Sequence, residues 1–326
     1  MKTFIIQEND KDQRLDKFLQ KSIPRLPQSL LYKYLRKKRI KVNQKKCALN
    51  YRMQLNDRVD LYIGDEFFSA QPEYQFLSAP ATVKVIYEDE HILLVNKPQG
   101  LVVHEDNENT MDTLIHRVQH YLYLKREYQP EDELSFAPAL CNRIDRNTCG
   151  IVIIAKDAAT LRILNEKIKN RELVKKYICL VLGTPEPPNA TLVHYLEKNH
   201  QENKVKIYQK PHANAKTIVT KYRVISSKNH LSLVEVDLKT GRTHQIRAHM
   251  AYIGHPLLGD GKYGNNAINK KYGYKHQALC SYYLKFKFQS DAGILDYLNG
   301  KHFILQDIWF AQQFYQNGCI SKNILL

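Results

Sequence analysis

The sequence lacks the features that mark membrane and secreted proteins. No apolar run approaches the roughly 18 residues that a membrane-spanning helix needs. The opening residues, MKTFIIQEND, contain too short an apolar stretch for a signal peptide. The six cysteines form no Cys-x-x-Cys pair and no regular spacing, which argues against a disulfide framework or a zinc site. We therefore expect a cytoplasmic protein with reduced thiols and no membrane partner.

Acidic residues are scarce as well. The 326 residues include 33 Asp and Glu against 49 Lys and Arg, which gives a formal net charge of +16. This surplus favours a nucleic acid as partner, although a basic membrane-surface protein or charge for solubility alone are alternatives. The distribution of charge separates them, because nine basic residues and no acidic residue lie between Arg25 and Lys46. A patch this concentrated favours nucleic acid.

Composition and periodicity divide the chain into three segments. Residues 1–65 predict a small α+β module, in which Ser29 would cap the second helix. Residues 66–81 have neither helical nor strand periodicity and contain two prolines, which is typical of a linker. Its aromatic residues indicate that this linker is partly packed. Residues 82–326 predict a single domain of mixed type.

The large domain has the pattern of a sheet with few intervening helices. Residues 218–224 and 231–238 alternate apolar and polar positions, as half-buried strands do. Helices are expected over residues 111–124 and directly after Asp157, which would cap the second of them. This pattern predicts the α+β class, with a largely antiparallel sheet flanked by helices.

The stretch CNRIDRNTCGIVIIAK, residues 141–156, has the composition of a polar site that leads into a buried strand. It places Asp145 between Arg143 and Arg146, and the most apolar run of the chain follows Gly150. Taken alone, Arg-Ile-Asp-Arg is most often a surface ion pair. The motif that surrounds these four residues is longer, and its length favours a functional carboxylate instead.

This stretch resembles the catalytic motif of RluA-type pseudouridine synthases, which runs His-Arg-Leu-Asp, two residues, then Thr-Ser-Gly. Four positions match the motif: Arg143, Asp145, Thr148 and Gly150. Three positions depart from it: Asn142 replaces His, Ile144 replaces Leu and Cys149 replaces Ser. The departures leave the implied chemistry in place, because neither His nor Ser has a required proton-transfer role there.

Three further segments resemble proteins of this kind. Residues 239–263 contain Gly-Arg-x-His-Gln-Ile-Arg and Gly-His-Pro-x-x-Gly-Asp, like a second family motif. Lys176-Tyr177 opens an apolar strand, as the family's tyrosine motif does. Residues 14–45 resemble an S4 RNA-binding domain. The resemblance thus covers nearly the whole chain, with the motifs in the family's order.

The resemblance implies a catalytic site made of three side chains. Asp145 would act on the ribose, either as a nucleophile at C1′ or as a base that removes the C2′ proton. Arg247 would pair with Asp145 and hold it ionised, and Tyr177 would contact the target uracil. Arg143 would fill the gap that a flipped nucleotide leaves. The other residues expected to bind RNA are Asn142, Thr148, Arg242, His244, Arg36, Lys37, Lys38 and Arg39.

Neither a metal nor an organic cofactor is expected. His244, His249 and His255 are five and six residues apart, which does not place them on one helical face, and no cysteine joins them. Residues 259–264 spell G-x-G-x-x-G, but Pro256 precedes them and no amphipathic helix follows. We therefore expect a turn there rather than a dinucleotide site.

These features together predict a pseudouridine synthase that acts as a monomer on structured RNA. The S4-like segment favours large-subunit (23S) ribosomal RNA or a ribosome precursor over tRNA, and a tRNA pseudouridine synthase is an alternative. A ribosome-assembly factor that binds RNA without catalysis is a second alternative. A glycosidase is a third, although it would need a second carboxylate that the motif does not supply.

Overall fold

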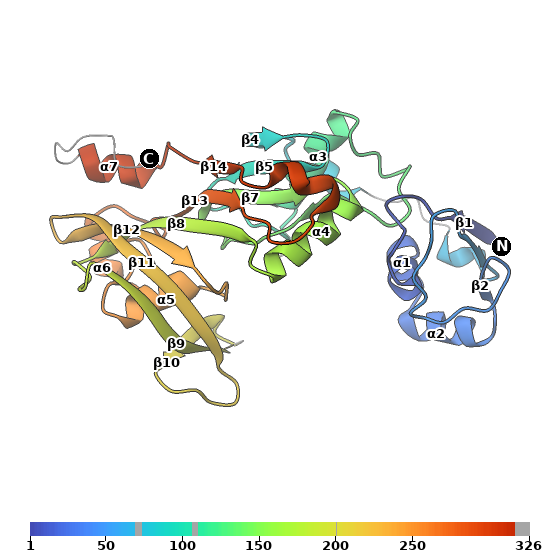
Figure 1. The fold of residues 1–326 in the computed structure, drawn as a ribbon, viewed down its shortest axis with the longest axis horizontal. Coiled ribbons are helices and arrows are strands. Elements are labelled where there is room, and N and C mark those ends of the chain that lie inside the picture. Colours follow the sequence, from blue (N-terminus) through green and yellow to red (C-terminus); the bar gives the residue numbers. More distant parts are fainter. Residues whose placement is uncertain (69–73, 106–109, 200, 317–326) are drawn as a thin grey trace.

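A computed structural model describes residues 1–68, 74–105, 110–199 and 201–316 (Figure 1). This part of the chain contains a three-stranded sheet near the N-terminus and an 11-stranded sheet in the remainder. We refer to residues 1–68 as the N-terminal unit and to residues 74–316 as the main unit. Among the described helices, none combines the length and the apolar character that crossing a bilayer requires.

The N-terminal unit packs two helices on a small antiparallel sheet. The sheet has the order β1 (Lys2–Ile5), β3 (Arg58–Leu61), β2 (Ile40–Val42), and the helices are α1 (Leu15–Ser22) and α2 (Gln28–Arg36). Apolar residues of both helices and all three strands form one buried cluster.

The prediction that Ser29 caps α2 is wrong. Pro27 precedes the helix, and Ser29 lies in its first turn without capping it. The proline ring fixes φ near −57°, a value compatible with helix entry, so the chain turns into the helix before Ser29.

The segment expected to be a linker is partly packed, as its aromatic residues predict. Phe67 and Phe68 pack against the core of the N-terminal unit. Phe76 is buried in the main unit, where its ring centroid lies 5.8 Å from those of Tyr123 and Tyr128. Residues 69–73 lie outside the described residues.

The main unit is built on the 11-stranded sheet, whose strand order is β10-β9-β11-β12-β8-β13-β7-β5-β4, with β14 beside β13 and β6 beside β7. The strands are β4 (Val85–Glu88), β5 (Ile92–Lys97), β6 (Ala139–Leu140), β7 (Cys149–Ala155), β8 (Leu173–Leu182), β9 (Asn189–Asn199), β10 (Lys204–Tyr208), β11 (Lys216–Lys228), β12 (Leu231–Leu238), β13 (Leu279–Phe286) and β14 (His302–Ile304). The pair β13–β7 is parallel and the other pairs of this sheet are antiparallel. The predicted α+β class with a largely antiparallel sheet is therefore confirmed.

Helices cover both faces of this sheet. They are α3 (Leu114–Leu124), α4 (Ala158–Lys169), α5 (Gln245–Tyr252), α6 (Asn266–Lys271) and α7 (Trp309–Gln316), with the 3-10 turns η2 (Gln75–Ser78) and η3 (Gly293–Leu298); the 3-10 turn η1 (Asp65–Phe67) belongs to the N-terminal unit. Helices α3 and α5 pack on the face that carries Val152 and Tyr177. Helices α4 and α7 pack on the other face, against the alternate residues Ile153 and Ile178 respectively. Asp157 caps α4 as predicted, because its Oδ1 accepts a hydrogen bond of 2.7 Å from the Thr160 N–H.

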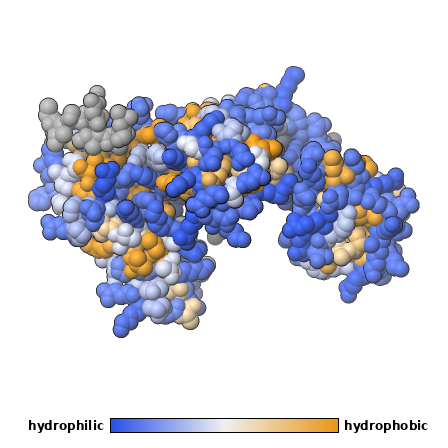
Figure 2. Space-filling view, in the orientation of Figure 1, coloured by the Kyte–Doolittle hydropathy of each residue, from blue (hydrophilic) through white to orange (hydrophobic). Residues whose placement is uncertain are grey.

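The two units meet through polar contacts around residues 9–13. The Asn9 amide donates to Glu133 at 2.8 Å, and the Gln13 amide donates to the Ser135 hydroxyl at 2.7 Å. In Figure 1 the N-terminal unit lies at one end of the molecule, beyond α4 and away from β9 and β10. Figure 2 shows a mostly hydrophilic surface on this side, interrupted by small hydrophobic groups.

Candidate active site

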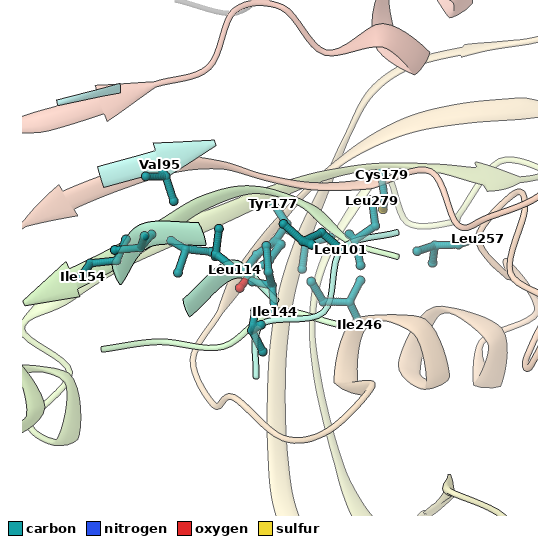
Figure 3. Close-up of a cluster of buried hydrophobic side chains, with 14 of the residues drawn as sticks. Val95, Leu101, Leu114, Ile144, Ile154, Tyr177, Cys179, Ile246, Leu257 and Leu279 are labelled. Carbon is teal, nitrogen blue, oxygen red and sulfur yellow. The ribbon is translucent and has the colours of Figure 1, made fainter. Parts of the chain in front are cut away.

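The predicted catalytic loop connects β6 to β7 and presents Asp145 at its middle. Ile144 is buried in the core of the main unit, where Tyr177 and Ile246 also lie (Figure 3). The neighbours on either side differ, since Arg143 is exposed and Asp145 is partly exposed. The buried isoleucine therefore anchors the loop, and the two charged residues flank it on the solvent side.

A buried lysine that was not singled out from the sequence holds this loop in place. Lys97, at the end of β5, is 0% exposed, and its Nζ donates to three backbone carbonyls: Pro98 at 2.9 Å, Leu101 at 2.6 Å and Arg146 at 2.8 Å. Burial lowers the pKa of Lys97 to about 8, with the negative charges expected at Cys149 and Asp145 opposing the shift. The only sequence signal for this role is a lysine that ends an apolar strand directly before a proline turn.

Arg247 of α5 binds the carboxylate of Asp145, as the resemblance implies. Its Nη1 lies 3.0 Å from Asp145 Oδ2, and the guanidinium is only 6% exposed. On its other side, Nε and Nη2 bind the two oxygens of Asp260 at 2.7 and 3.0 Å. Arg247 is thus held in place by the buried Asp260, and its remaining Nη1 group binds the partly exposed Asp145.

Asp260 is the second functional residue that was not singled out from the sequence. It is 0% exposed, and its Oδ1 also accepts from the backbone N–H groups of Lys262 and Tyr263. Burial alone would raise the pKa of Asp260, but the hydrogen bonds and charge of Arg247 outweigh it and lower the pKa. Its position in the Gly-Asp ending of the second motif was the available signal.

His244 lies beside Asp145 rather than at a remote RNA-binding surface. Its Nε2 is 4.0 Å from Asp145 Oδ2, and its Nδ1 is 2.9 Å from the hydroxyl of Tyr263. The residue precedes α5 in the left-handed conformation, with φ of 52°. Burial lowers the pKa of His244 to about 4, so the ring is neutral at pH 7.

Tyr177 lies beneath the loop on β8 and is nearly covered. It is 7% exposed, it packs in the cluster that contains Ile144 (Figure 3), and its register partner on β13 is Ser281. Burial raises the pKa of Tyr177 to about 12, and the nearby charge of Asp145 acts in the same direction. The phenol is therefore close to Asp145 and fully protonated at neutral pH.

Two residues predicted to bind RNA are buried instead. Asn142 is 8% exposed, and its Oδ1 accepts a hydrogen bond of 2.8 Å from the Ile153 N–H, which fastens the loop to β7. Thr148 is 2% exposed, and its hydroxyl lies 3.4 Å from the Gln277 amide. Both side chains make internal contacts in this structure, and a contact of either residue with RNA stays a prediction.

The remaining predicted contacts are exposed but lie in two separate places. Arg242 is exposed just before α5, close in sequence to His244. Arg36, Lys37, Lys38 and Arg39 are all exposed at the end of α2 and in the turn that follows, in the N-terminal unit. We refer to these last four residues as the basic patch.

The chemistry available at Asp145 is that of one carboxylate held by the Arg247 guanidinium, with the neutral His244 ring 4.0 Å away. Within the described ranges, no group of three or more His, Cys, Asp or Glu side chains is arranged to hold a metal ion. Residues 259–264 form turns as predicted, and they are followed by the short helix α6. The turn carries Asp260, so its role here is to orient Arg247.

Comparison with known proteins yields consistent matches. Residues 91–252 match the family model described as RNA pseudouridylate synthase. An RNA pseudouridine synthase of Mycoplasma genitalium, described as uncharacterized, is 34% identical over 292 residues, which cover 87% of this chain and 88% of that protein. Ribosomal large subunit pseudouridine synthase C of Escherichia coli K12 is 30% identical over 275 residues, covering 83% and 82%. Among solved structures, human RNA pseudouridylate synthase domain containing 4 has a similar fold, with a TM-score of 0.57 at 22% identity over 72% of this chain and 92% of that one.

Proposed function

The chain belongs to the RNA pseudouridylate synthase family, and from this premise we propose that it isomerises specific uridines of large-subunit ribosomal RNA through Asp145. The observation that carries the proposal is the contact of Asp145 with Arg247, which is itself clamped by a buried acid. The name of the Escherichia coli relative supports ribosomal RNA as the substrate class.

The proposed reaction begins with extrusion of the uridine from the RNA, because its glycosidic bond is out of reach in a stacked base. Exposed Arg143 fills the space that the nucleotide leaves. Asp145, ionised and oriented by Arg247, then acts on the ribose, at C1′ as nucleophile or at the C2′ proton as base. Uracil departs as an anion, turns within the site and rejoins the sugar through C5.

Tyr177 lies on β8 beneath the catalytic loop, and we assign it a supporting role in this reaction. Its raised pKa means that the phenol is protonated when the site is empty. It packs in the buried cluster that also contains Ile144, and it is 7% exposed. We propose that it positions the base and helps to remove the C5 proton at the end, a step in which the phenol must give up its own proton before its oxygen accepts the one from C5.

The acid content of the site favours isomerisation over hydrolysis. A glycosidase needs a second carboxyl group to protonate the leaving group or to activate water. The second acid here is Asp260, which is held by two bonds from Arg247 and by two backbone N–H groups. It is therefore occupied in orienting Arg247 and is not free to transfer a proton.

The N-terminal unit supports RNA docking. We propose that residues 1–65 form an S4-like RNA-binding domain, that residues 66–81 connect it to the rest, and that residues 82–326 form the catalytic domain. The basic patch would bind backbone phosphates of a structured RNA and so position the enzyme. A cytoplasmic, monomeric enzyme is the form that we propose.

The test is tritium release from ribosomal RNA that carries 5-tritiated uridine. Wild type is expected to release tritium, whereas Asp145→Asn should release none while its RNA affinity persists. Asp132→Asn, which changes an exposed acid outside the site, is the matched control and should behave as wild type. If wild type binds the RNA tightly but releases no tritium, a non-catalytic assembly factor is favoured instead. If tritium is released from tRNA but not from ribosomal RNA, the protein is a tRNA pseudouridine synthase.

A further inference from the structure

Two cysteines lie side by side where the catalytic loop enters the sheet. Cys149 of β7 and Cys280 of β13 are direct partners in the parallel pairing of these strands. Neighbouring strands lie about 4.8 Å apart, and directly paired residues project to the same face. Disulfides form between residues whose Cα atoms are about 4.4 to 6.8 Å apart, so this pair lies within reach of a bond.

No side chain fits between the two strands at the position after Cys149. The next residue is Gly150, with φ of 118°, and a Cβ atom there would lie 2.3 Å from the carbonyl oxygen of Ser281. Only glycine fits, so the contact between the strands is fixed by the sequence. The Cys149 Sγ lies 3.5 Å from the carbonyl oxygen of Leu279, which directs this thiol toward β13.

Both thiols also line one cavity of about 540 Å³, together with Lys97, Arg117 and Trp309. Cys149 is partly exposed, whereas Cys280 is only 2% exposed. A small reagent in the cavity therefore reaches Cys149 first and finds the second thiol directly behind it.

The environment favours thiolate formation at Cys149 over the other core cysteines. A hydrogen bond from the Cys280 thiol lowers the pKa of Cys149, burial opposes this, and the Lys97 ammonium adds to the lowering. The same pairing raises the pKa of Cys280. By contrast, burial raises the pKa of Cys141 to about 12 and also raises that of Cys179. Thiolate character governs reactivity toward oxidants.

We propose that Cys149 and Cys280 are a site of oxidative modification, at which a peroxide converts the two thiols into a disulfide. The Cys149 thiolate attacks one oxygen of hydrogen peroxide, which breaks the O–O bond, releases hydroxide and leaves a sulfenic acid. The Cys280 sulfur then attacks the Cys149 sulfur, its proton leaves with the departing hydroxyl as water, and the S–S bond forms. Overall, two thiols and one peroxide give one disulfide and two waters.

The bond would disturb the catalytic loop. Two sulfur atoms in a disulfide are about 2.05 Å apart, closer than any non-bonded contact between them, so Cys149 must move toward β13. Thr148 precedes Cys149 directly, and its backbone N–H donates to the carbonyl of Asp145 at 3.0 Å. Displacement of about 1 Å in a positioned catalytic group is costly, so oxidation is expected to reduce turnover about tenfold or more. This consequence rests on the proposed function, whereas the disulfide itself does not.

The experiment treats purified full-length protein with hydrogen peroxide and maps cysteines by mass spectrometry of peptides digested without reduction. Wild type and the matched control Cys47→Ser, which changes a partly exposed thiol of the N-terminal unit, should yield the peptide pair joined through Cys149 and Cys280. Cys149→Ser and Cys280→Ser should not. Absence of this pair in wild type, or preferential linkage to another cysteine, would overturn the proposal.

Tritium release before and after oxidation supplies the second measurement. Oxidised wild type should lose activity and regain it with dithiothreitol, whereas Cys149→Ser should be active and insensitive to peroxide. Serine is the residue that the resembling family has at this position, so the reduced variant is expected to work. If the disulfide forms and tritium release stays unchanged, the proposed effect on the catalytic loop is overturned. Absence of release from reduced wild type would count against the proposed function and leave the peptide mapping readable.

Discussion

At the scale of single residues, the site is organised around one oxygen of Asp145. Arg247 lies 3.0 Å from Oδ2, and His244 approaches the same oxygen to 4.0 Å. The tautomer of His244 follows from its neighbours: the Tyr263 hydroxyl accepts from the Val205 N–H at 2.9 Å, which leaves its own proton for His244 Nδ1. The proton of the neutral imidazole then sits on Nε2, facing the carboxylate. A shift of about 1 Å would complete this hydrogen bond.

We therefore expect His244 to act as a positioning residue for Asp145. His244→Leu should lower the single-turnover rate of tritium release about tenfold, since a hydrogen bond to a charged group contributes about 1.5 to 3 kcal/mol. RNA affinity should be unchanged. His244→Gln is the matched control, because its amide N–H can occupy the place of Nε2, and it should retain most of the rate. Equal losses in both variants, or a loss that follows RNA affinity, would contradict the assignment.

At the scale of secondary-structure elements, α5 and its preceding turn carry most of the site. His244, Arg247 and His249 lie within six residues of chain, and α5 begins at Gln245. His249 is 0% exposed and bridges two strands: one ring nitrogen lies 2.8 Å from His194 of β9 and the other 2.8 Å from Thr220 of β11. The helix is thus fixed to the sheet by a neutral imidazole pair.

This arrangement predicts acid sensitivity. Burial, and secondarily the neighbouring His194, lowers the pKa of His249 from 6.5 to about 4. Between these values the unfolded chain binds the proton and the folded chain does not, so stability falls as pH drops from 6.5 toward 4, by about 3 kcal/mol for this group. Urea unfolding at pH 7.5 and 5 should show about 2 kcal/mol of this loss, because pH 5 lies about 1.5 units below 6.5 and the remainder appears only as the pH approaches 4. His249→Asn should be less stable at pH 7.5 but lose less on acidification. The exposed control His212→Asn should keep the wild-type pH dependence, and an unchanged dependence in His249→Asn would contradict the account.

The elements that the sequence predicts best are those whose signals are local. The cap Asp157 and the strand after Gly150 depend on neighbours in the chain, and the structure contains both. Lys97 and Asp260 depend on partners far away in sequence, since one binds the carbonyl of Arg146 and the other binds Arg247. The local signals for these two residues, a lysine before a proline turn and the acid of a Gly-Asp pair, do not reveal which distant partner each one binds.

Membership of a motif does not tell whether a residue contacts the substrate or holds the loop in place. Asn142 and Arg143 are neighbours in the motif stretch, yet Asn142 Oδ1 accepts a hydrogen bond from the backbone of β7 whereas Arg143 is exposed. The alternation of buried and exposed positions along an extended loop separates the two roles, but only after the buried face is known. Of the two, the exposed Arg143 is the residue that we expect to touch RNA.

At the scale of the whole molecule, the basic patch and Asp145 lie in different units. The basic patch lies at the end of α2, whereas the N-terminal unit contacts the main unit through residues 9–13. Asp145 lies in the middle of the main unit, on the loop before β7. A phosphate-binding surface at a distance from the reacting carboxylate should change how tightly RNA binds without changing the chemical step.

Removal of charge from the basic patch tests whether RNA binding and the chemical step depend on different units. Replacing Arg36, Lys37, Lys38 and Arg39 with glutamine should weaken RNA binding and reduce the slope of log affinity against log salt, because each lost phosphate contact removes about 0.7 to 0.9 from it. The slope should therefore fall by about 3 if all four residues contact phosphates. The single-turnover rate at saturating RNA should stay at the wild-type value. A control with the same net charge replaces the exposed Lys198, Lys210, Lys270 and Lys271 of the main unit with glutamine. If both variants lose the same slope, total charge rather than the basic patch governs binding; if only the patch variant does, the N-terminal unit is the RNA-docking surface.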